Sequence, residues 1–182
     1  MQALQNVSLF LVEVLFSFYI VAILLRFLLA WARANFYNPL SQFLVRITNP
    51  VLVPMRRLIP AIGKIDTAAI VLALGLTIIK VFLLMGLAGQ NYDIMSVVIY
   101  AISSLLRTII WIYIFALIVQ AIMSWTGNSY GNPMADLLSS LTTPLLRPIR
   151  NVIPDIGMID LSPMIAILLL NIVLIVLQSY GL

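Results

Sequence analysis

Apolar residues run along this chain in four long stretches, which shorter polar segments separate. Each stretch approaches or exceeds the roughly 20 residues that a helix needs to cross a bilayer. The stretches cover residues 9–31, 67–88, 95–124 and 163–179. The pattern therefore predicts an all-α integral membrane protein with four transmembrane helices.

The segment between the first two apolar stretches recurs, without a gap, between the last two. Residues 31–66 align with residues 125–160 at a constant offset of 94, and fifteen of the 36 aligned pairs are identical. Shared apolar character does not explain matched Trp, Asn-Pro, Gly and Asp residues, whereas a tandem duplication does. We therefore expect two parallel repeats, residues 1–89 and 90–182, each with a span, a loop and a second span. The loops cover residues 32–66 and 125–162.

Prolines define the corners of both loops, because proline fixes φ and cannot donate an i→i−4 hydrogen bond. The opening Asn-Pro pair is typical of an N-cap and a first helical residue, and the apolar spacing after it predicts an amphipathic helix. A second short helix is expected between the later prolines, followed by a glycine that permits a tight turn or a positive φ and by an aspartate that caps the next span. A tryptophan at the end of each odd-numbered span is expected to anchor at the interface. These structural positions are Trp31, Asn38, Pro39, Pro50, Pro54, Pro60, Gly63, Asp66, Trp125, Asn132, Pro133, Pro144, Pro148, Pro154, Gly157 and Asp160.

Lys and Arg outside the spans are concentrated in the two loops, while the terminal tails and residues 89–94 hold none. The positive-inside rule then places both loops in the cytoplasm and both termini outside. We expect the amphipathic helices to lie in the interface rather than deeper, where exposed backbone at the prolines would be costly. Anionic lipid explains the net charge of +4 without a nucleic acid partner. The candidate contacts with lipid headgroups or a partner protein are Arg56, Arg57, Arg147 and Arg150.

Four ionisable residues fall inside the spans, where such groups are functional candidates. Glu13 and Arg107 occupy equivalent positions in the two repeats with opposite charge. They either form an ion pair or extend separately to the outer interface, and Lys80 competes with Arg107 for Glu13. Arg26 is expected to extend to the cytoplasmic interface, and Gln120 takes its place in the second repeat. Glu13, Lys80 and Arg107 thus form a candidate intramembrane charge cluster.

Scattered hydroxyl and amide residues in the spans are explained by hydrogen bonds between helices, without a pore. Cysteine and histidine are absent from the sequence. Their absence excludes disulfides, thiolate chemistry, imidazole catalysis and the usual zinc sites. The loop carboxylates form no catalytic constellation, and no Gly-rich phosphate loop is present. We therefore expect a protein that is not an enzyme and needs no cofactor or metal.

The repeated motifs resemble the YggT (YlmG) family, whose members carry one or two copies of a two-span domain. The second repeat carries Ser124-Trp125, Asn132-Pro133, the run Leu141–Arg150 and Ile159–Pro163. Where the family commonly has Glu before the loop proline, this chain has Asn49 and Thr143. The resemblance implies a multi-pass protein of the bacterial plasma (inner) membrane without an established enzyme activity. It also implies a link to envelope functions or to osmotic and potassium homeostasis.

Two main functional hypotheses follow. The first is a membrane scaffold, adaptor or assembly factor whose paired Pro-rich loops engage an unidentified membrane or cytoplasmic protein, or anionic headgroups. It is motivated by residue identity that is concentrated in the loops. The alternative is a small transporter or channel-like protein in ion or osmotic balance, supported by Glu13, Lys80 and Arg107. Lipid-surface sensing by the loop arginines is a third reading, and self-association into a homo-oligomer is compatible with all three.

Overall fold

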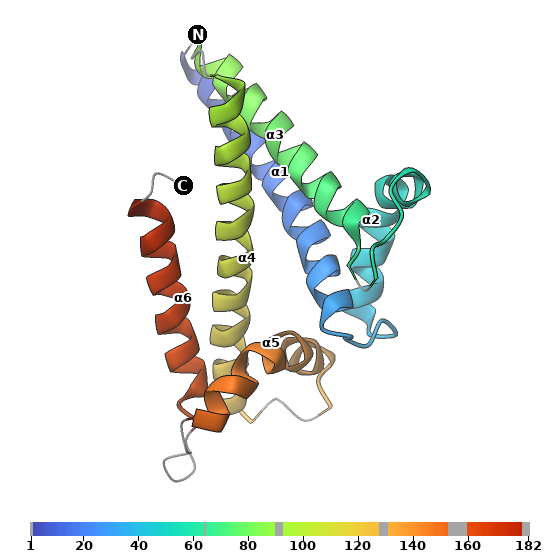
Figure 1. The fold of residues 1–182 in the computed structure, drawn as a ribbon, viewed down its shortest axis with the longest axis vertical. Coiled ribbons are helices and arrows are strands. Elements are labelled where there is room, and N and C mark those ends of the chain that lie inside the picture. Colours follow the sequence, from blue (N-terminus) through green and yellow to red (C-terminus); the bar gives the residue numbers. More distant parts are fainter. Residues whose placement is uncertain (1, 64, 90–92, 128–130, 153–159, 180–182) are drawn as a thin grey trace. The chain divides into compact units, whose positions relative to one another are not determined.

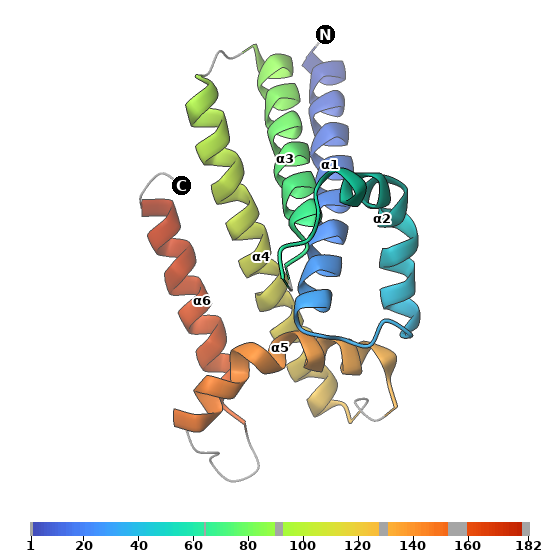
Figure 2. The same ribbon diagram turned by 45° about the vertical axis from the view of Figure 1, so that its right-hand side comes forward.

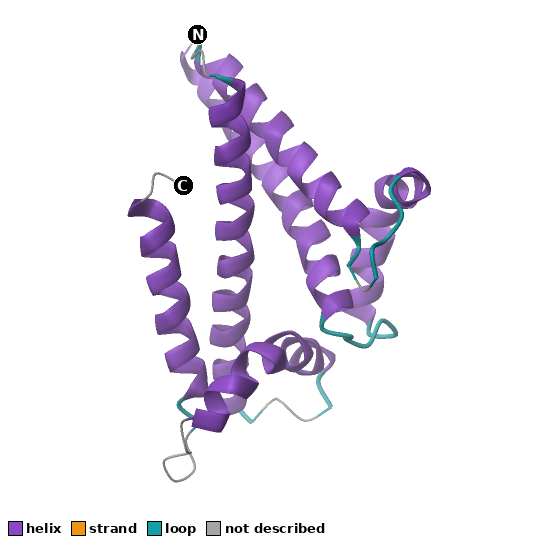
Figure 3. Ribbon diagram, viewed as in Figure 1, coloured by secondary structure: helices purple, strands orange, loops and turns teal. Residues whose placement is uncertain are grey.

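The computed structural model describes residues 2–63, 65–89, 93–127, 131–152 and 160–179. These residues form six helices and no strand beyond one isolated bridge between Ile62 and Ile65 (Figure 3). The four helices long and apolar enough to cross a membrane are α1 (Gln2–Trp31), α3 (Thr67–Ala88), α4 (Ile94–Trp125) and α6 (Ser162–Ser179). The predicted all-α fold with four spans is confirmed, and the chain is a multi-pass membrane protein.

The loops contain the two remaining helices, α2 (Pro39–Leu58) and α5 (Pro133–Val152). The expectation of two short helices per loop is wrong, because each loop holds one continuous 20-residue helix with two internal prolines. Each helix changes direction along its length (Figures 1 and 2). An internal proline removes one backbone hydrogen bond and bends a helix, but the neighbouring bonds can carry the helix past it. The prolines therefore set bends in these helices rather than ends.

The chain packs into two compact units that do not follow the boundary between the repeats. The first unit consists mainly of Met1–Phe27 and Leu44–Thr108, and the second of Leu28–Phe43 and Ile109–Gly181. The start of the first loop, including the first turn of α2, therefore packs with residues of the second repeat.

The two loop helices bury equivalent leucines. Leu52 of α2 is fully buried in the first unit. Its counterpart in α5, Leu146, forms a buried cluster with Leu117 of α4 and Ala166 of α6 in the second unit. Identity at this pair of positions thus reflects a packing requirement, because truncating a buried leucine leaves a cavity.

Large apolar side chains remain exposed along the spans. Phe10 of α1, Phe115 of α4 and Ile175 of α6 are examples. A contiguous apolar exterior is unusual for a water-soluble protein. It is the surface expected of helices that lie against lipid.

Candidate functional site

The predicted N-caps of both loop helices are confirmed. Oδ1 of Asn38 accepts a 3.0 Å hydrogen bond from the backbone N–H of Leu40, and Oδ1 of Asn132 accepts one of 2.9 Å from Met134. Asn38 makes a further contact, since its Nδ2 donates to the carbonyl oxygen of Pro133 at 2.6 Å. One asparagine therefore caps α2 and ties that cap to the first residue of α5.

A buried threonine in each loop helix joins that helix to the preceding span. In the first unit, Nη1 of Arg26 donates to Oγ1 of Thr48 at 2.6 Å. In the second unit, Oγ1 of Thr142 donates to Oε1 of Gln120 at 2.5 Å. These are equivalent positions in the two repeats, and both threonines are fully buried.

The expectation that Arg26 extends to the interface is wrong. Arg26 is only 7% exposed and lies inside the first unit, where it contacts Thr48. A guanidinium carries five N–H donors, and a hydroxyl on an adjacent helix gives one of them a partner within the protein. Arg26 is therefore part of the packing between α1 and α2.

An Arg–Asp ion pair, whose members are ten residues apart, closes each loop. Nη2 of Arg56 lies 2.5 Å from Oδ2 of Asp66, and Nη2 of Arg150 lies 2.7 Å from Oδ2 of Asp160. Asp66 also caps α3, as predicted, by accepting from the backbone N–H of Ala69. These two arginines were candidate partner contacts, and the structure shows that each is engaged by its own loop.

The Asp160 carboxylate combines two kinds of contact. It accepts a 2.9 Å hydrogen bond from the backbone N–H of Ser162, in addition to those from Arg150. Partial burial alone would raise the pKa of Asp160, but the hydrogen bonds from Ser162 and Arg150 outweigh burial and lower it below the ordinary value of 3.8. The ionised form of Asp160 is therefore the one that closes the second loop.

The turn inside the first loop has the expected geometry. Gly63 has φ of +61°, which confirms the predicted positive φ, and the adjoining residues Ile62 and Ile65 exchange backbone hydrogen bonds of 3.1 and 3.0 Å. Glycine adopts this conformation without the steric cost that other residues incur. The corresponding predictions for Pro154 and Gly157 lie outside the described residues.

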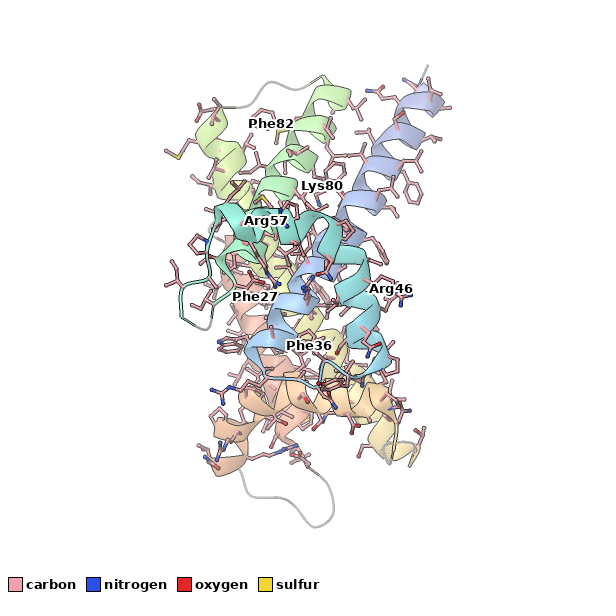
Figure 4. All side chains as sticks on the ribbon, turned by 90° about the vertical axis from the view of Figure 1, so that its right-hand side faces the viewer. Phe27, Phe36, Arg46, Arg57, Lys80 and Phe82 are labelled. Atoms are coloured by element: carbon pink, nitrogen blue, oxygen red, sulfur yellow. The ribbon has the colours of Figure 1, made fainter. Side chains whose placement is uncertain are left out.

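The remaining candidate arginines lie on the outside of the loop helices. Arg57 of α2 and Arg147 of α5 are exposed. Neither has a carboxylate partner within 4 Å among the residues that the structure describes. Arg46, a further basic residue of α2, is also exposed and projects away from its helix (Figure 4). These side chains are available to an external anion or acidic surface.

Within the candidate charge cluster, Glu13 pairs with Lys80 rather than with Arg107. Nζ of Lys80 lies 3.2 Å from Oε1 of Glu13 and 3.2 Å from Oγ of Ser17, in the first unit. The guanidinium of Arg107 lies over the ring of Tyr100, with 5.6 Å between its central carbon and the ring centroid. That position allows a cation–π interaction. The repeat symmetry therefore does not decide the pairing of Glu13.

A small cavity with several polar lining residues lies beside this ion pair, within the first unit. Its volume is about 50 Å³, and its lining includes Ser17, Thr77, Lys80, Ser104 and Thr108. Lys80 is 9% exposed and is labelled on α3 in Figure 4.

A family model described as CCB3/YggT matches the chain twice in tandem, at residues 5–87 and 99–181. The chain belongs to this family. It is 39% identical to "Uncharacterized protein PA0392" of Pseudomonas aeruginosa, over 95% of this chain and 89% of that protein. It is also 39% identical to "Uncharacterized protein YggT" of Escherichia coli K12, over 93% of this chain and 88% of that protein. No solved structure matches the chain significantly.

A more distant relative matches less of the chain. "Uncharacterized protein ycf19" of Guillardia theta is 32% identical over 73 residues, which are 39% of this chain and 79% of that protein. The two matches of the family model and this short relative agree with the internal repeat predicted from the sequence.

Several features of this YggT-family chain were missed or misread from the sequence. The hydroxyls of Thr77, Ser103 and Thr108 donate to carbonyls four residues earlier in their own helices, so the expected bonds between helices are wrong for these three. The contact of Asn38 with Pro133 had no signal in the sequence. The bond between Arg26 and Thr48 did have a signal in the sequence. These two residues are 22 positions apart, and so are their counterparts Gln120 and Thr142 in the second repeat.

Proposed function

We propose that this YggT-family protein is a non-enzymatic membrane scaffold or adaptor, and that α2 and α5 each present a docking surface. The observation that supports the proposal most is that both loop helices are held at matched points. Each is capped by Asn, bonded to the preceding span through Thr, and followed by an Arg–Asp pair. A surface that is already ordered loses less conformational entropy on binding.

The exposed side of the loop helices combines basic and apolar residues. Arg57 is followed by Leu58, which is 79% exposed, and Val152 at the end of α5 is 80% exposed. Exposed apolar groups beside arginines fit an acidic amphipathic partner or the headgroup region of an anionic bilayer. The identical Asn, Thr, Arg and Asp residues of the two loops are occupied by contacts within the protein. The docking surface is therefore assigned to their exposed neighbours.

The proposal includes a location and an orientation. The concentration of Lys and Arg in the loops supports a cytoplasmic position for α2 and α5, with both termini outside. Family membership and the four apolar helices support residence in a bacterial inner membrane.

Site-specific photo-crosslinking in living cells tests this function. A photoreactive amino acid replaces Arg57 or Arg147, and the matched controls carry it at Phe10 or Phe115, exposed positions on the spans. A scaffold gives a discrete protein adduct from the loop positions that the span positions lack. Adducts with lipid alone would assign the surface to headgroup binding, and no loop-specific adduct would contradict the proposal.

A small transporter is the second candidate, because Lys80 and Glu13 lie within apolar helices beside a polar cavity. Purified protein in liposomes, compared with a Lys80→Met variant, tests it by potassium, proton and osmolyte flux. Flux that depends on Lys80 would support transport, and its absence would remove this candidate.

A further inference from the structure

The cavity of the first unit is lined by a buried ammonium group and by hydroxyl groups. Lys80 is more than nine-tenths buried, and its ammonium donates to Glu13 and Ser17. An ammonium has three N–H donors. Two of them have these partners, so a third remains for the cavity.

The hydroxyls around the cavity supply further hydrogen-bonding capacity. Thr77 and Thr108 donate their single protons to the carbonyl oxygens of Ala73 and Ser104. Their oxygens can therefore only accept bonds from a guest. The Ser104 hydroxyl donates to no other described side chain or carbonyl, so it can serve as a donor. The lining thus offers donors as well as acceptors.

The charges at the site cancel. The Lys80 ammonium lies 3.2 Å from the Glu13 carboxylate, and those two residues supply the formal charges beside the cavity among the described residues. An ion that entered the cavity would lose its hydration shell. The site has no net charge that could compensate for this loss, so binding an ion inside the membrane would be costly. The chemistry of the lining therefore favours an uncharged guest.

We propose that this cavity is an intramembrane hydration site, which binds water beside the Lys80–Glu13 pair of the first unit. A water molecule needs about 10–15 Å³ of such volume. The cavity of about 50 Å³ is therefore large enough for at least one water molecule. The guest class is small, uncharged and able both to donate and to accept hydrogen bonds. This inference does not depend on the docking function.

The second repeat provides an internal comparison. Leu174 occupies the position equivalent to Lys80 and packs in a buried apolar cluster with Ile110 and Ile114. Equivalent positions therefore carry a buried ammonium in the first unit and a buried apolar side chain in the second.

Single cysteines test the proposal directly, because the natural chain contains none. Thr77→Cys and Ser104→Cys place a thiol in the cavity lining, and Leu174→Cys and Ile114→Cys are the matched apolar controls. The protein is reconstituted in lipid nanodiscs and treated with methyl methanethiosulfonate, which reacts with the thiolate. A thiol in contact with water ionises more readily than one in an apolar site. Because only the thiolate reacts, the labelling rate is proportional to the fraction of the thiol that is ionised. We expect at least about tenfold faster labelling at the cavity positions.

A second variant separates hydration from loose packing. Ser104→Leu, added to Thr77→Cys, fills the cavity and should reduce labelling of the introduced thiol to the rate of the Leu174→Cys control, with an unchanged helix content. Equal labelling of Thr77→Cys and Leu174→Cys would overturn the proposal. The measurements are repeated with chloride or gluconate as the buffer anion. A labelling rate or thermal stability that differs between the two anions would contradict an uncharged guest.

Discussion

Nδ2 of Asn38 donates a 2.6 Å hydrogen bond to the carbonyl oxygen of Pro133. This contact joins the cap of α2 to the first turn of α5, so the two loop helices start from a shared point. Its partner position in the second repeat, Asn132, caps α5 but donates to no described residue in return. The repeat is therefore asymmetric at this contact.

Asn38→Asp should destabilise the protein more than Asn132→Asp. Both changes keep an oxygen that can cap the helix, but only the first removes a donor that a carbonyl oxygen uses. A hydrogen bond of this kind contributes about 0.5–1.5 kcal/mol. Thermal unfolding of the two variants in detergent checks this expectation. Equal losses in the two variants would show that the contact with Pro133 contributes nothing beyond the cap.

Thr48→Val should cost more than Thr142→Val, although the two threonines are equivalent and fully buried. Thr48 accepts from the charged Arg26, whereas Thr142 contacts the neutral amide of Gln120. Hydrogen bonds to charged groups contribute about 1.5–3 kcal/mol and neutral ones about 0.5–1.5 kcal/mol. Unfolding free energies of both variants measure the difference. In an Arg26→Gln background, the cost of Thr48→Val should fall to that of Thr142→Val.

Arg56→Gln should loosen the end of the first loop without unfolding the protein. The ion pair with Asp66 is partly exposed, so we expect a contribution below about 1 kcal/mol. The rate of backbone amide hydrogen exchange in the segment from Arg56 to Asp66 should rise up to about fivefold. A free energy of about 1 kcal/mol corresponds to this factor. Arg57→Gln is the matched control, because Arg57 has no described carboxylate partner. A similar increase in both variants would contradict a specific role for the ion pair.

The second loop should open at acidic pH. The pKa of Asp160 is lowered in the folded protein, so its ionised contacts stabilise fully above the ordinary value of 3.8. That stabilisation is lost as the pH falls through the lowered pKa. Hydrogen-exchange protection around Arg150, corrected for the intrinsic effect of pH on exchange, should therefore be constant near neutral pH and decrease below about pH 3.8. Asp160→Asn should remove this acid step, and persistence of the step in that variant would assign it to another group.

The loops were the part of the chain that the sequence predicted best. Asn-Pro pairs, the positive-φ glycine and the capping aspartate act through residues close in the chain, so a local pattern contains the information. The prolines of α2 and α5 are the exception. Proline disfavours a helix interior, but the buried threonine and leucine of each loop helix give tertiary contacts that keep the helix continuous.

The charged residues of the spans were predicted least well. Spans that are apolar all round have little amphipathic direction, so the sequence does not indicate which face of α1 meets which neighbour. Glu13 had two candidate cations for this reason, and only the packing of α3 against α1 places Lys80 within reach. Arg26 was assigned to the interface because its partner, Thr48, lies in a different helix.

The division into compact units has a consequence for how this protein can be taken apart. Residues 28–43, which belong to the first repeat by sequence, pack with the second unit. A cut in the connection between α3 and α4 would therefore not release two self-sufficient halves. Each fragment would lack a piece of structure that the other one carries, and co-expression of both fragments would be needed to restore the whole.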